Sequence, residues 1–149
     1  SIENGLNNIP MFRIKEFEDV DENSIVRPEA ILSTEWLGQD YYSIWSGVAT
    51  LPLKYNIYGS FSVSDTESGS ITLRLNKGQG FFFRSEPNSK IQYIQINGGE
   101  KFFIPRDFPP ASKWLFLEFN NPSLPDTFNV EITDEGAGWG EWSAVGLIR

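Results

Sequence analysis

The chain has 149 residues, of which 15% are aromatic, but it contains no histidine and no cysteine. Ser-His-Asp and Cys-His catalysis and disulfide bonds are therefore excluded, and the usual ligands of zinc, copper and haem are missing. The net charge of −8 disfavours binding to nucleic acids or anionic membranes. The sequence contains no run of about 18 apolar residues, the length needed to span a membrane.

The chain is expected to form one domain preceded by a short arm. Residues 1–10 are rich in Asn and Gly and end at Pro10, so we interpret them as a flexible arm or tether and residues 11–149 as the domain. Residues 11–19 (MFRIKEFED) resemble the opening strand of jelly-roll binding modules. Helical periodicity is almost absent, and a short helical turn is predicted at residues 28–32 or 109–113.

Strand signals follow one another at intervals of roughly 8–12 residues, which is typical of all-β sandwiches and barrels. Residues 71–75 and 128–133 alternate between apolar and polar side chains, which predicts strands with one buried and one wet face. Residues 114–119 are largely apolar on both faces, which predicts a central strand covered on both sides.

Turn signals separate these strands. Asn97-Gly98-Gly99 predicts a hairpin between residues 91–96 and 100–104. Residues 76–80 (NKGQG) predict a second hairpin, with a longer loop, between residues 71–75 and 81–84.

The fold class expected from these signals is all-β: a single antiparallel β-sandwich of nine or ten strands with jelly-roll-like connections. The side chains expected on its inner face are Leu73, Leu115, Leu117, Phe128, Val130 and Ile132.

The densest acidic run covers residues 16–23. Carboxylate oxygens in a loop are the ligands that Ca²⁺ prefers, so this run is a candidate calcium site. Its candidate ligands are Glu16, Glu18, Asp19, Asp21 and Glu22, and a second candidate is Asp134-Glu135. The alternative is a solvated loop that keeps an edge strand from pairing with another chain.

Two aromatic runs point rings to both sides of a strand. In residues 81–83 (FFF) and 102–103 (FF), we expect at least one ring of each run to face outward or to lie under a loop. The alternative is that both faces of each strand are buried.

A ligand site is predicted where aromatic rings occur together with short polar side chains. A ring can stack on the apolar face of a sugar while carboxylate and amide groups take its hydroxyls, and glycine lets the backbone approach the ligand. The candidate platform rings are Trp36, Tyr41, Tyr42, Trp139 and Trp142. The candidate hydroxyl partners are Gln39, Asp40 and Glu141. The alternative is that these rings are structural.

The function expected from these features is non-catalytic carbohydrate binding, with a glycan or polysaccharide as partner and an extracellular, virion-surface or cell-surface location. The 20 acidic side chains could supply a glycosidase pair, but their spacing fits solvated carboxylates better, so we expect no enzyme. The alternative is a structural β-sandwich subunit of a virion, tail fibre or extracellular filament, with identical subunits as partners.

Overall fold

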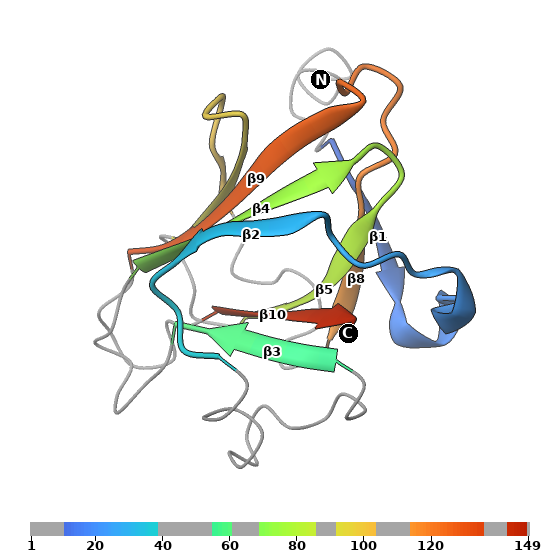
Figure 1. The fold of residues 1–149 in the computed structure, drawn as a ribbon, viewed down its shortest axis with the longest axis horizontal. Helices are drawn as coiled ribbons and strands as arrows, with labels where there is room; N and C mark the ends of the chain where they lie inside the picture. The colour runs from blue at the N-terminus through green and yellow to red at the C-terminus, as the bar shows by residue number, and fades with distance from the viewer. Residues whose placement is uncertain are drawn as a thin grey trace, which may run out of the picture.

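The computed structural model describes residues 11–38, 55–60, 69–85, 92–103, 114–135 and 143–148. These residues form two five-stranded antiparallel sheets that pack face to face (Figure 1). The first sheet has the order β1 (Arg13–Glu16), β8 (Leu115–Glu118), β5 (Gly80–Ser85), β10 (Ser143–Ile148), β3 (Tyr55–Gly59). The second sheet has the order β2 (Ala30–Thr34), β4 (Gly69–Asn76), β9 (Thr127–Asp134), β6 (Gln92–Ile96), β7 (Phe102–Phe103). The predicted antiparallel β-sandwich is confirmed.

Strands β3 to β10 form a jelly roll. The first of them pairs with the last, β3 with β10, and the pairs β4–β9, β5–β8 and β6–β7 follow in nested order. The chain is thus one long antiparallel ribbon wrapped into two sheets. Strand β1 extends the first sheet beside β8, and β2 extends the second sheet beside β4.

The predicted turn at Asn97 is confirmed, and the predicted hairpin at residues 76–80 is wrong. Asn97 and Gly98 have φ values of 51° and 67°, which suit a tight turn between β6 and β7. Residues 77–79 instead carry the chain from β4 in one sheet to β5 in the other. The amides of Lys77 and Gly78 bond to the carbonyls of Asp126 and Phe119 in the β8–β9 connection.

The inner faces of the two sheets form the main core. Its members include five of the residues expected there, and the sixth, Leu115, is also buried. The five are Leu73, Leu117, Phe128, Val130 and Ile132. Phe81 and Phe83 also point into this core.

A second apolar cluster covers the outer face of the first sheet. Phe82 and Phe116 lie there beneath Phe17, Val20 and Ile25, and the rings of Phe17 and Phe82 stack with centroids 5.2 Å apart. The covering segment contains two 3-10 turns, η1 (Phe17–Asp19) and η2 (Glu22–Ser24). Strand β8 is therefore covered on both sides, as predicted. In the run 81–83 the ring of Phe82 lies under this segment, as expected, and both faces of that run are buried.

Three other expectations have mixed outcomes. Residues 28–32 form no helical turn, because most of them belong to the edge strand β2. In β7, Phe102 packs against the core and Phe103 is exposed, so one ring of that run faces outward as predicted. The predicted arm, residues 1–10, and the alternative helical turn at 109–113 lie outside the described residues.

Within the described ranges no helix is long and apolar enough to span a membrane.

Candidate functional site

The two ends of the sandwich differ in how the chain crosses between the sheets. At one end the crossings are residues 77–79 and 119–126, which the structure describes. At the other end β3, β5, β7 and β9 finish and β4, β6, β8 and β10 begin, and the residues that connect them, 61–68, 86–91, 104–113 and 136–142, lie outside the described residues.

Four buried polar residues lie at this second end, which we call the polar end. They are Ser60, Gln92, Asp134 and Ser143, with exposed fractions between 0% and 5%. Each lies two positions along the chain from a residue that packs in the core: Tyr58, Ile94, Ile132 and Val145. Because alternate residues of a strand share a face, these polar groups continue the inner face where apolar side chains would be expected.

A hydrogen bond joins the two sheets at the polar end. The Ser60 hydroxyl, at the end of β3, donates to the carboxylate of Asp134, at the end of β9. The backbone amide of Ser143 donates to Ser60 Oγ over 3.0 Å, and the Ser60 amide donates to the Ser143 carbonyl over 2.9 Å. The Asp134 carboxylate is therefore held in place by the first sheet.

Gln92 has a buried amide without a hydrogen bond. It pairs in register with Asp134 and is fully buried, and neither its Nε2 nor its Oε1 has a partner within the described part of the chain. The Oγ atom of Ser143 is likewise buried and has no hydrogen-bond partner among the described residues. A buried polar group left unpaired costs about 1–3 kcal/mol, so the Gln92 amide opposes folding unless something binds it.

Trp36 is not a free platform ring, which corrects the sequence-based expectation. Only 4% of its surface is exposed, and it packs in the main core. The turn after β2 directs it inward, because the Trp36 amide donates to Thr34 Oγ1 over 3.0 Å. A tryptophan next to polar residues looks the same in sequence whether it is core or surface, so composition could not separate the two cases.

The other predicted ligand residues lie outside the described residues, but both of the stretches that contain them border the polar end. Gln39, Asp40, Tyr41 and Tyr42 follow Gly38, and Trp139, Glu141 and Trp142 precede Ser143. Leu37 bonds to Gly59 through its amide and its carbonyl, at 3.0 and 2.9 Å. Ser143 bonds to Ser60, the next residue. The borders of two stretches a hundred residues apart thus meet at the end of β3.

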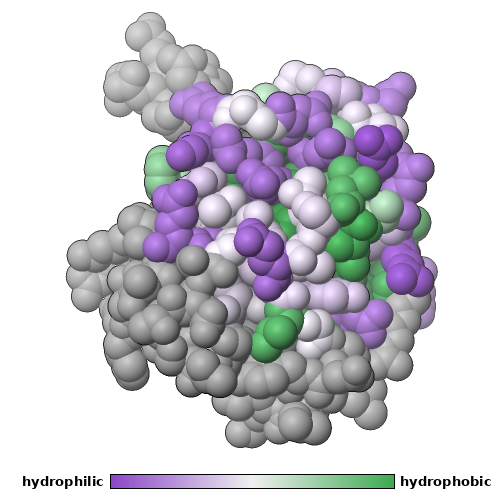
Figure 2. Space-filling model, turned by 60° about the vertical axis from the view of Figure 1, so that its left-hand side comes forward, coloured by the Kyte–Doolittle hydropathy of each residue, from purple (hydrophilic) through white to green (hydrophobic). Residues whose placement is uncertain are grey.

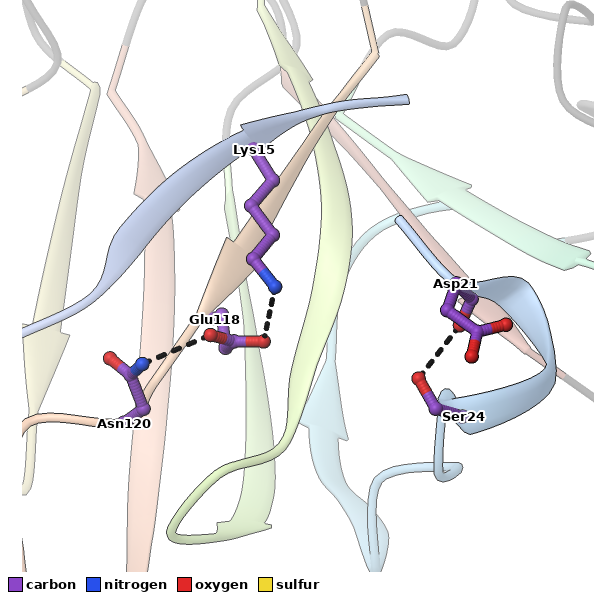
Figure 3. A network of polar contacts seen from close by, with 5 residues as sticks. All are labelled: Lys15, Asp21, Ser24, Glu118 and Asn120. Atoms are coloured by element: carbon purple, nitrogen blue, oxygen red, sulfur yellow. Dashed lines mark hydrogen bonds and ion pairs between the residues drawn. The ribbon is translucent and has the colours of Figure 1, made fainter. Parts of the chain in front are cut away.

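The acidic run that was predicted to bind calcium serves as the cover of the second cluster. Its apolar members face the sheet, while Asp21 accepts a hydrogen bond from the amide of Asn23 and, through its carbonyl, one from the hydroxyl of Ser24 (Figure 3). Glu22 Oε1 accepts a hydrogen bond of 2.8 Å from the Tyr55 hydroxyl. Burial of Tyr55, together with this hydrogen bond to a carboxylate, raises its pKa well above the usual value.

A pocket of about 160 Å³ lies between this cover and β8, with charges of both signs around it. Lys15 Nζ lies 3.0 Å from Glu118 Oε2, and Asn120 donates to the other oxygen of Glu118 (Figure 3). Asp19 and Asp21 complete the charged lining. Among the residues that the structure describes, no three acidic side chains are grouped closely enough to hold a metal ion. Calcium binding therefore stays a prediction without support from the geometry.

The four residues of the polar end were not predicted as one site; Asp134 was expected only as part of a second calcium candidate, with Glu135. A signal for them exists in the sequence, because Gln92 and Asp134 extend the alternation of Ile94 and Ile132 with a polar side chain. These features define a jelly-roll β-sandwich with polar side chains on the inner face of one end. The sequence matches no family model, and the comparisons with curated proteins and with solved structures found no similar protein.

Proposed function

We propose that this chain is a non-catalytic carbohydrate-binding domain whose ligand site lies at the polar end of the sandwich. The observation that carries the proposal is the buried Gln92 amide, which has no hydrogen-bond partner within the described part of the chain. Gln92 pairs with Asp134, whose carboxylate bonds to Ser60 where the borders of both predicted ligand stretches meet. An amide offers a donor and an acceptor, and the unpaired hydroxyl of Ser143 offers the same two functions. Neutral groups that both donate and accept are what the hydroxyls of a sugar require.

The surrounding sequence supplies the rest of such a site. Tyr41, Tyr42, Trp139 and Trp142 are the candidate platform rings, and Gln39, Asp40 and Glu141 are the candidate partners at its rim. The net charge of −8 favours neutral or cationic ligands over anionic ones.

The alternative, a structural subunit that assembles with copies of itself, has less support from the surface. Such a subunit needs a contiguous apolar patch. Among the coloured residues of Figure 2, most are hydrophilic or near neutral, and the hydrophobic ones form one narrow band on the right-hand side and a few isolated spots. The large apolar side chains that are exposed in the described ranges are Met11, Ile14, Val26, Leu32, Leu37 and Phe103.

The experiment combines a glycan array with calorimetric titration of any sugar that binds, for the native chain and the variant Gln92→Leu. We expect the variant to lose sugar binding while its free energy of unfolding stays equal or rises by about 1–2 kcal/mol, because an unpaired buried amide is removed. Gln95→Leu, on the same strand and outside the polar end, is the matched control and should bind normally. An empty array, or full binding by Gln92→Leu, would contradict the proposal.

The rings are tested by Tyr42→Ala, Trp139→Ala and Trp142→Ala, made singly. A platform ring should lose sugar binding with little change in melting temperature. Collapse of stability in all three variants would show that the rings are structural and would favour the assembly alternative.

A further inference from the structure

The two lateral edges of the sandwich are closed in different ways. At the edge formed by β1 and β7, Phe12 contacts the rings of Phe102 and Phe119, with centroids 5.3 and 5.2 Å apart, and aromatic side chains fill the space between the sheets. At the opposite edge lie β2 and β3, which Figure 1 shows on the same side of the molecule. A pocket of about 380 Å³ opens here, and we call it the edge cleft.

The inner wall of the edge cleft is apolar and belongs to the core. Leu147 of β10 is a member of the main core, and Ile31 of β2 and Tyr58 of β3 pack against it. A volume of this size is within the range of about 300–1,000 Å³ found for small-molecule sites. Ile31 and Tyr58 are half-buried, whereas Leu147 is buried, so the first two side chains supply the apolar surface for one small ring.

The rim of the edge cleft carries polar groups that are not engaged. The polar residues that line the cleft are Arg27, Glu29, Asn56 and Tyr58. Asn56 is engaged elsewhere, but the side chains of Arg27, Glu29 and Tyr58 have no hydrogen bond or ion pair within the described ranges. The backbone of this segment is fixed nevertheless, because the Glu29 amide donates to the Arg74 carbonyl over 3.0 Å.

The chemistry of the rim selects the class of ligand. One cation and one anion cancel, which gives no net attraction for an ionic ligand. The guanidinium donates only, the carboxylate accepts only, and the phenol does both. A ligand that satisfies all three groups needs several hydroxyls, and the inner wall requires an apolar ring face.

We propose that the edge cleft is a second saccharide site, which binds one neutral hexose unit. The ring would lie against Ile31 and Tyr58, with Arg27 and Glu29 bonded to its hydroxyls. This site uses none of the residues of the polar end and does not depend on binding there.

The first test is a titration of the isotope-labelled chain with the methyl glycosides of glucose, galactose and mannose, followed through its backbone amide resonances. At millimolar sugar we expect shifts of the amides of Glu29, Ile31, Tyr58 and Leu147 with at least one glycoside. Shifts confined to Gln92, Asp134 and Ser143 would overturn the edge cleft and support the polar end. Shifts confined to the edge cleft would support the edge cleft and count against the polar end. If none of the three sugars shifts the amides of the edge cleft, this inference is overturned.

The second test uses Arg27→Gln and Glu29→Gln, which change exposed side chains and leave the backbone bond to Arg74 in place. Each should weaken binding of the shifting glycoside at the edge cleft by about tenfold, the loss expected for one charge-assisted hydrogen bond. Arg13→Gln, an exposed arginine on β1, is the matched control and should bind as the native chain does. Unchanged affinity in both rim variants would overturn the assignment.

Discussion

At the residue scale, Gly80 shows how closely β5 approaches β8. A Cβ atom at this position would overlap the Leu117 carbonyl oxygen and the ring of Phe116. We expect Gly80→Ala to lower the free energy of unfolding by about 3 kcal/mol, measured by urea denaturation, because neither backbone can yield. Gly99→Ala, in the exposed β6–β7 turn, is the matched control and should cost about 1 kcal/mol or less, since its Cβ would meet the Ile96 carbonyl only at 3.1 Å. Equal losses in the two variants would contradict the close contact.

Also at the residue scale, Tyr55 links stability to alkaline pH. Its pKa is raised in the folded state by burial and by the hydrogen bond to Glu22, whereas in the unfolded chain it is about 10. The stabilising effect is therefore complete below pH 10, and it is lost as the pH rises above 10, where the unfolded chain releases this proton first. We expect Tyr55→Phe to show a smaller loss of stability above pH 10 than the native chain, measured by denaturation at several pH values.

The same variant should also be less stable at neutral pH. Removing the phenol leaves Glu22 without this donor, which costs about 1 kcal/mol. Tyr93→Phe removes another phenol bonded to a carboxylate, that of Glu135, and is the control for the loss of one hydroxyl at neutral pH. Parallel stability curves of Tyr55→Phe and the native chain above pH 10 would refute the linkage.

At the element scale, the segment from η1 to η2 covers the outer face of the first sheet. Phe17→Ala should uncover Phe82 and destabilise the fold by about 2 kcal/mol, less than for a fully buried ring because Phe17 is half-buried. The neighbouring exposed Glu18→Ala should change the free energy of unfolding by less than about 0.5 kcal/mol. A larger loss from Glu18 than from Phe17 would mean that the carboxylates, not the apolar side chains, hold the segment.

Period-two alternation located the strands and most of the core, because one buried face leaves a direct trace in the order of residues. The alternation does not say which sheet a strand joins. The turn at residues 77–79 therefore looked like a hairpin, although its partners lie in the β8–β9 connection. The apolar run 81–83 gave no sign of what covers its outer face, since the cover comes from Phe17, far away in sequence. The prediction that Trp36 is an exposed platform ring was wrong for the same reason, because tertiary contacts decide which side chains are buried.

At the scale of the whole molecule, calcium binding can be tested by thermal unfolding. We expect the same melting temperature in millimolar calcium and in excess chelator, because Asp21 and Glu22 already accept hydrogen bonds within the cover. A ligand that binds only the folded state would raise the melting temperature. A rise in calcium that disappears in the double variant Glu18→Gln/Asp19→Asn would restore the predicted metal site.

The nested pairing of β3 with β10 has a consequence for how the chain reaches its fold. Strand β10 lies between β5 and β3, so β3 stays separated from the rest of the first sheet until β10 arrives. Contacts between residues so distant in sequence slow folding to the range of milliseconds to seconds. During synthesis, β3 and β5 leave the ribosome long before β10 can join them. Until then their unpaired edges are exposed to other chains, so the time before β10 arrives is when this protein is most prone to aggregate.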